Sequence, residues 1–235
     1  MSWTHTEIAG KPADVFDPGP AALPFVLIEL HDEDGLSPAS NPIFTAELSK
    51  RRLRCVAPHA GRSWWVDRIC PEFDAELSAE RHLLDNVIPE IEATQKPGPR
   101  GIAVCGVGMG GQGAVRLGLR HSERFPIVAS IAGAFDLHER YGRGTPLDDM
   151  YPSREHARQD TAILHIGHHC PAHIWFACPP ASEWYRGNDR LHEKLVALGV
   201  AHTADLDTNA EPARFFGPML DFIVASLERE SRRLA

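Results

Sequence analysis

The sequence lacks both an excess of positive charge and any long apolar run. It has 24 Lys and Arg residues against 32 Asp and Glu residues, for a formal net charge of -8 at pH 7. Nucleic acids and anionic membrane surfaces attract basic stripes, so we expect neither as a partner. No apolar run approaches the ~18 residues of a membrane-spanning helix. We expect a cytoplasmic protein whose partner is a small molecule or another protein, with a homo-oligomer as an open alternative.

Cysteine is also scarce, with five residues in the chain. An odd number leaves one thiol unpaired, and Cys55 and Cys105 lie in or beside apolar runs typical of buried strands. Free thiols in such places behave as small hydrophobic side chains. We therefore expect no disulfide framework.

What the chain does contain is a regular alternation of β-type apolar runs with helical periodicity. Runs at 25–30, 53–59, 127–133, 173–178 and 201–206 predict strands, whereas 42–50, 75–94, 188–198 and 212–230 predict helices. Residues 1–24 predict an edge strand or hairpin, and residues 135–164 predict loops with short helices that form a cap insertion. This order favours one α/β domain over residues 1–235, with a mostly parallel sheet between two helical layers.

A glycine-dense turn lies at the centre of the chain. Residues 101–119 predict a buried strand, a sharp turn and a helix, and the turn reads Gly106-Val107-Gly108-Met109-Gly110-Gly111-Gln112-Gly113. Two motifs have this shape. One is the nucleophile elbow G-x-S-x-G, with Gly108 in place of the serine. The other is the dinucleotide fingerprint G-x-G-x-x-G, which Gly106, Gly108 and Gly111 satisfy.

Five stretches of the sequence follow a further common pattern. They are Leu30-His31, similar to L-H-G; residues 63–67, similar to S-W-Y-x-D; residues 106–113, similar to G-x-S-M-G-G-x-G; residues 121–136, similar to H-P-x-x-F and S-G-x-x-D; and residues 188–200, similar to a last helix and strand. Together they resemble the esterase D or S-formylglutathione hydrolase type of the α/β-hydrolases. The likeness runs over roughly residues 20 to 227 and implies the α/β-hydrolase fold.

The resemblance places the catalytic triad on residues that lack its chemistry. The nucleophile position is Gly108, the acid position is Ser182 with Glu183 beside it, and the histidine position is Ala210. No histidine follows His202. Because a hydroxyl nucleophile needs an adjacent base, and the base needs an orienting partner, we expect no intact catalytic residue.

The loop that should complete an oxyanion hole departs from the pattern as well. One N–H donor should come from Met109 and the other from the loop after the first central strand. In that loop L-H-G has become His31-Asp32-Glu33-Asp34. Carboxylates here would oppose a developing oxyanion, which is a second argument against acyl transfer.

The dinucleotide alternative is weaker than the hydrolase-like interpretation. Its fingerprint normally opens the first βαβ unit of a domain, whereas two strands and two helices precede it here. The flanking residues also follow the esterase pattern. We therefore expect no NAD and no other cofactor.

A cluster of histidine and cysteine side chains spans nine residues: His165, His168, His169, Cys170 and His173. Imidazole and thiolate are zinc ligands, but structural zinc sites generally take them from two well-separated pairs. We expect no metal here.

Two functions therefore remain open. The favoured one is a non-catalytic pseudo-hydrolase that binds a small ligand or a protein partner. The alternative is an active carboxylesterase or thioesterase with a relocated site. His31 and His59 each end a strand at the expected site, where they serve such a site or pair with a neighbouring aspartate.

Overall fold

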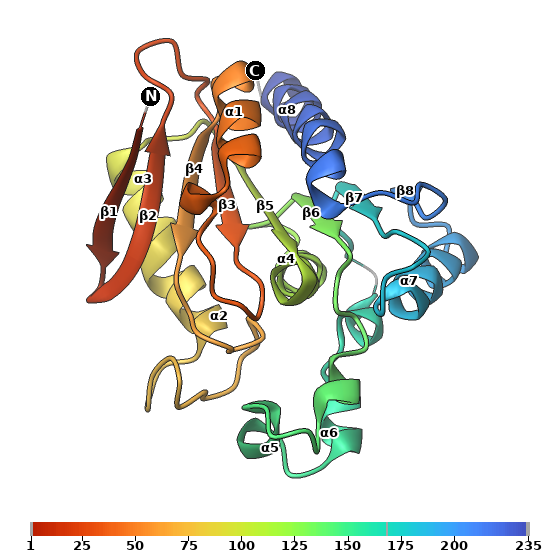
Figure 1. Ribbon diagram of the computed structural model, residues 1–235. Helices are drawn as coiled ribbons and strands as arrows, with labels where there is room; N and C mark the ends of the chain where they lie inside the picture. Colours follow the sequence, from red (N-terminus) through yellow and green to blue (C-terminus); the bar gives the residue numbers. More distant parts are fainter. Residues whose placement is uncertain (1, 168, 234–235) are drawn as a thin grey trace.

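The computed structural model describes residues 2–167 and 169–233, whose strands form one eight-stranded sheet in the order β1-β2-β4-β3-β5-β6-β7-β8 (Figure 1). The strands are β1 Ser2–Ile8, β2 Lys11–Asp17, β3 Val26–Leu30, β4 Arg54–Pro58, β5 Ile102–Val107, β6 Ile127–Ile131, β7 His173–Ala177 and β8 Thr203–Asp205. The main helices are α1 Pro42–Arg51, α2 Ala79–His82, α3 Ile88–Thr94, α4 Gly108–Arg120, α7 Tyr185–Ala197 and α8 Phe216–Arg233.

The edge of the sheet is the predicted hairpin. Strand β1 pairs antiparallel with β2, from Ser2 opposite Asp17 to Ile8 opposite Lys11. The turn between them passes through Ala9 and Gly10, both with positive φ, as in a type I′ hairpin turn. Strand β2 pairs antiparallel with β4, and every later pairing is parallel. The parallel strands therefore all end at one edge of the sheet, where ligand sites of such folds lie.

Helices cover both faces of the sheet, as the alternating sequence predicts. Helices α1 and α8 lie in contact over one face, and α2, α3, α4 and α7 lie over the other (Figure 1). A hydrophobic core lies on each face of the sheet. Alternate side chains of β3 belong to different cores: Leu27 packs toward α1 and α8, whereas Ile28 and Leu30 pack toward α4.

The helix predicted over residues 75–94 begins later and contains a π-helical turn. Asp74 accepts hydrogen bonds from the N–H groups of Glu76 and Leu77, and Ser78 caps a helix that starts only at Ala79. Residues 83–87 then form a π-helical turn before α3. Pro89, which has no N–H to donate, lies at the start of α3, and a π-turn is one way to absorb that lost bond.

Residues 135–164 form short helical pieces beyond the carboxyl ends of the strands, as predicted (Figure 1). They are η3 Leu137–Arg140, α5 Leu147–Met150, α6 Arg154–Gln159 and η4 Ala162–His165. The fully buried guanidinium of Arg116 in α4 pairs with Glu80 and with Asp160, which fixes this segment to the core. Its role as a cap and the single-domain boundaries stay predictions.

Two further expectations meet the structure directly. All five thiols are free, and four of them are buried, so the absence of disulfides is confirmed. Within the described residues, every helix is too short or too polar to cross a bilayer.

Candidate functional site

The predicted strand, sharp turn and helix are present at the glycine-dense segment. Strand β5 ends at Val107, Gly108 takes a φ of 52°, and α4 begins there. This is the left-handed region, which glycine enters without the cost that a side chain imposes. A Cβ atom at Gly110 would overlap the carbonyl of Leu30, and one at Gly113 would overlap Trp65. The glycines therefore allow α4 to lie against β3 and the buried loop at residues 63–66.

One oxygen of Asp32 accepts both N–H groups that an oxyanion hole would use. Asp32 Oδ1 lies 2.8 Å from the amide nitrogen of Met109 and 2.8 Å from that of Glu33. The first is the residue after the elbow, and the second belongs to the loop after β3, which are the two places where hydrolases of this shape provide donors. The carboxylate thus sits where the oxyanion of a tetrahedral intermediate would form.

The same carboxylate also takes the space above Gly108. A Cβ atom at position 108 would lie closer to all three carboxylate atoms of Asp32 than folded proteins allow. Val107 offers no side-chain cap to α4, so Asp32 supplies both the missing cap and the negative charge that a helix N-terminus favours. Burial raises the pKa of Asp32 above its ordinary value, and the two N–H donors oppose that rise.

The other two triad positions lie in loops at the same edge and carry no catalytic group. Ser182 follows β7, where its Oγ accepts a hydrogen bond of 3.2 Å from the Trp184 amide. Ala210 lies in the loop between β8 and residues 212–215 and packs against the core beneath α1 and α8. Neither position offers an imidazole or a carboxylate.

Arg140 links three loops over this edge. Its Nη2 lies 2.8 Å from Glu183 Oε1 and 3.7 Å from Glu33 Oε2, and its guanidinium stacks 4.7 Å from the centre of the Trp184 ring. Burial raises the pKa of Glu33, whereas Arg140 lowers it. Glu183 is thus an ion-pair partner of Arg140, which is a structural role for the carboxyl beside the acid position.

His31 has no free ring nitrogen for base catalysis. Its Nδ1 donates to the carbonyl of Asp32 at 2.8 Å, and its Nε2 accepts from the Ala60 amide at 3.0 Å. Burial lowers the pKa of the ring, in keeping with a neutral imidazole that holds two loops together.

His59 pairs with an aspartate, as the structural interpretation expected, but the partner is Asp14 of β2. Its Nε2 lies 2.9 Å from Asp14 Oδ2, and His5 Nδ1 lies 3.0 Å from Asp14 Oδ1. These three side chains are the one group of possible metal ligands among the described residues whose ligand atoms lie within 4.8 Å of one another. Burial raises the pKa of Asp14, but hydrogen bonds from Ser37 and from the two imidazoles outweigh this effect and lower it below its ordinary value.

The histidine cluster of residues 165–173 does not converge where it is described. His165 Nε2 lies 3.1 Å from Asp160, His173 Nε2 lies 3.0 Å from Glu230, and the Cys170 thiol faces the Gly167 carbonyl. His169 is exposed and belongs to no group of possible ligands among the residues described. His168 lies outside the described residues.

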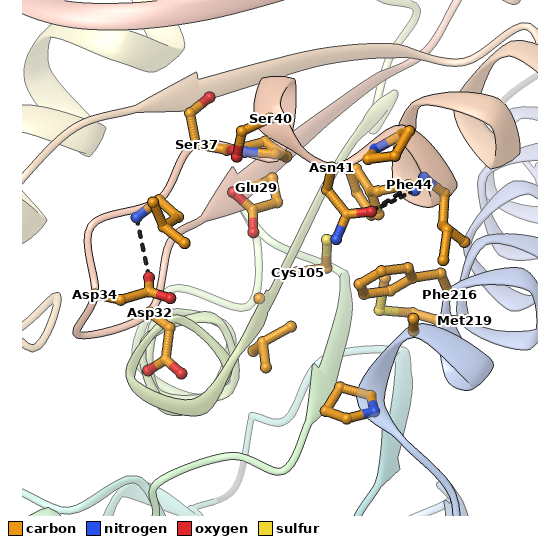
Figure 2. Close-up of a pocket in the computed structure, with 18 residues that line it drawn as sticks. Glu29, Asp32, Asp34, Ser37, Ser40, Asn41, Phe44, Cys105, Phe216 and Met219 are labelled. Atoms are coloured by element: carbon orange, nitrogen blue, oxygen red, sulfur yellow. Dashed lines mark hydrogen bonds between the residues drawn. The ribbon is translucent and has the colours of Figure 1, made fainter.

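A pocket of about 440 Å³ opens beside the elbow, between the ends of β3 and β5 and the two helices α1 and α8 (Figure 2). Glu29 of β3 points into it (Figure 2) and is 8% exposed. Within residues 2–167 and 169–233, no group hydrogen-bonds to its Oε2. Burial raises the pKa of Glu29 to about 8, and the neighbouring carboxylates of Asp32 and Asp34 add to the rise.

Comparison with known proteins places this geometry in a family. The model of the family described as Putative esterase matches residues 57–205, which is most of the chain. The chain belongs to this esterase family. No curated protein matches the sequence.

Solved structures show that the fold is that of the α/β-hydrolase esterases. A ferulic acid esterase superposes with a TM-score of 0.75 at 14% identity, covering 97% of this chain and 99% of that one. The fluorophosphonate-binding serine hydrolase F of Staphylococcus aureus gives 0.74 at 11% identity, with 97% and 99% covered. An S-formylglutathione hydrolase of the same organism gives 0.72 at 12% identity, with 97% and 100% covered.

Two neighbouring positions differ from the esterase pattern in opposite ways: one has gained a polar side chain and the other has lost one. The family sequence L-H-G has glycine where this chain has Asp32, and the elbow has serine where this chain has Gly108. The side chain at the site therefore comes from the loop after β3 and not from the elbow. Sequence reasoning located both positions, but not the contact between them.

The Glu29 pocket is the feature that sequence reasoning missed. A signal for it was present, because Glu29 is the only charged residue in the apolar run at 25–30. Side chains alternate along a strand, so Glu29 points to the same buried face of the sheet as Leu27. The strand pattern therefore predicts a buried carboxyl at this position.

Proposed function

We propose that this esterase-family chain is a non-catalytic member that binds a small ligand and does not hydrolyse it. The observation that carries the proposal is the double hydrogen bond from Met109 and Glu33 to Asp32 Oδ1. A carbonyl oxygen of a substrate would have to displace a carboxylate from these donors. Removal of even one oxyanion-hole donor typically costs ~10²–10³ in kcat, and here both are occupied.

The missing triad supports the same function independently. Gly108 offers no nucleophile, Ala210 no base, and both ring nitrogens of His31 are engaged with backbone groups. His59 is the second histidine considered as the base of a relocated site, and its Nε2 pairs with Asp14. Ligand binding is favoured over a scaffold role because the pocket beside the elbow is open and holds an unsatisfied carboxyl.

The proposal is tested by turnover of p-nitrophenyl acetate and S-formylglutathione. The purified protein should not exceed a matched heat-denatured control with either substrate. Saturable turnover that persists at constant specific activity through a second, different purification step would refute the non-catalytic assignment.

A further inference from the structure

The buried carboxyl of Glu29 is the least satisfied polar group of the pocket. It is more than nine-tenths buried, and among the residues that the structure describes its Oε2 lacks a partner, whereas buried polar groups are nearly always paired. An unpaired buried polar group destabilises the fold, and a ligand that donates a hydrogen bond to it would recover that loss. Figure 2 shows Glu29 directed into the open space between the loop at 32–37 and Cys105.

The polar neighbours of Glu29 are occupied elsewhere. Asp34 Oδ1 accepts from the Leu36 amide, Ser37 Oγ accepts from Ala39, and Ser40 Oγ donates to the Ser37 carbonyl. Asn41 Oδ1 caps α1 (Figure 2). None of these groups donates to Glu29 here, so the carboxyl is available to a ligand donor.

The charge of the pocket selects a cation. Glu29, Asp32 and Asp34 line it, and the described part of the chain contributes no Lys, Arg or His to the lining. The remaining titratable group on the wall is the thiol of Cys105 in β5, while α1 and α8 face the pocket with uncharged side chains. In the part of the chain that the structure describes, these carboxylates do not form a group of converging metal ligands. A compact metal ion is therefore a poorer fit than a larger cation.

The apolar side chains that line the pocket favour a ligand whose remaining part, beyond its cationic group, is apolar. Phe44, Phe216 and Met219 form a buried apolar wall beside Glu29 (Figure 2). Leu36 and Ile43 stand at the pocket with 64% and 52% of their surface exposed, although both are large hydrophobic residues. A volume of about 440 Å³ falls in the range of small-molecule sites.

We propose that the Glu29 pocket binds a primary organic ammonium with an apolar or aromatic body, the ammonium donating to the Glu29 carboxylate. This rests on the proposed ligand-binding function and names its ligand class. Because burial keeps Glu29 protonated near neutral pH, ammonium binding releases that proton to the solvent. The affinity should therefore increase from pH 6 to pH 8. The other acidic residues that line the pocket, among those described, are Asp32 and Asp34.

The test compares three ligands of similar shape by calorimetry: 2-phenylethylammonium, neutral 2-phenylethanol and anionic 3-phenylpropanoate. The ammonium should bind at least about tenfold more tightly than either analogue, with proton release seen as a dependence of the heat on buffer ionisation enthalpy. Glu29→Gln should weaken ammonium binding by at least about tenfold, as expected for a charged hydrogen-bond partner. Glu193→Gln, an exposed change on α7, is the matched control and should leave binding unchanged.

A second variant tests the pocket independently, in case Glu29→Gln fails to fold. Ala213→Trp places an indole in the pocket from residues 212–215 and should abolish ammonium binding while Glu29 is intact. Equal affinity of the wild type and a folded Glu29→Gln variant, a preference for the neutral or anionic analogue, or no binding at millimolar concentration would each overturn this inference. Those results, without ester turnover, would leave the non-catalytic assignment standing, whereas ester turnover would contradict that assignment and not the ammonium site.

Discussion

Asp32 and Gly108 compete for one volume, because the Asp32 carboxylate lies where any side chain at position 108 would begin. A serine at the elbow therefore requires the Asp32 side chain to leave the position it takes here. Asp32 in turn caps α4 through the Met109 amide, so the substitution at the elbow and the one in the loop support each other. The loss of the nucleophile is thus part of a packed arrangement.

The first prediction is that Gly108→Ser destabilises the fold by about 1–3 kcal/mol, since position 108 has a φ of 52° and the new Cβ meets Asp32. Urea unfolding at pH 7 measures the loss. Gly142→Ser serves as the control, because Gly142 also has a positive φ but open space around its Cβ position.

The pair should also be coupled. Asp32→Gly removes the clash, so the double variant Gly108→Ser, Asp32→Gly should lose less stability than the sum of the single changes, by about 1 kcal/mol or more. Strict additivity of the two losses would mean that the side chains do not share the space, and would contradict this description of the site.

Dinucleotides should not bind. The glycines at 106, 108 and 111 satisfy the fingerprint, but the N-terminus of α4, where a pyrophosphate would sit, already holds the Asp32 carboxylate. Millimolar NAD or NADP should leave the melting temperature unchanged. A saturable thermal shift of the wild-type protein would contradict this prediction. If Asp32→Gly did not enlarge that shift, Asp32 would not be what limits dinucleotide binding.

Glu29 should make stability depend on pH in a specific direction. Its pKa is about 8 in the folded protein against 4.5 ordinarily, so between these values the folded state holds a proton that the unfolded chain has lost. Its contribution to stability is complete below pH 4.5 and is lost as the pH rises to about 8, by about 1 kcal/mol per pH unit. Glu29→Gln cannot titrate, so its stability relative to wild type should increase from pH 5 to pH 8 in denaturant titrations. A difference that is constant with pH would contradict the buried position of the carboxyl.

Restoring the triad alone should fail. In the triple variant Gly108→Ser, Ser182→Asp, Ala210→His the new Cβ pushes the Asp32 carboxylate from its present position, but its negative charge stays beside the oxyanion donors, so we expect esterase activity close to background. Adding Asp32→Gly frees Met109 and Glu33 and should raise kcat/KM for p-nitrophenyl acetate on the order of 10² above the triple variant. Equal activities of the triple and quadruple variants would show that Asp32 does not block the hole.

Much of the fold was predictable because its signals are local. Continuous β-type apolar runs, helical periodicity and turn residues located the sheet, the hairpin and both helical layers, and the elbow motif located Gly108. The helix over residues 75–94 was wrong at its start because hydrophobic periodicity continues through the turn that Asp74 and Ser78 close. The site was harder for the opposite reason. That Asp32 would reach Met109, 77 positions later in the chain, depends on the pairing of β3 with β5, and no local pattern encodes that distance.

Intact mass after treatment with a fluorophosphonate probe tests the central claim most directly, because such probes report an activated serine whatever its position. The wild-type protein should remain at its unmodified mass under conditions in which a serine hydrolase is fully labelled, and so should the denatured control. The contradicting result is a single adduct on the folded wild-type protein that maps to one serine and is absent after denaturation. It would show that the protein has an activated serine although Asp32 occupies the oxyanion donors.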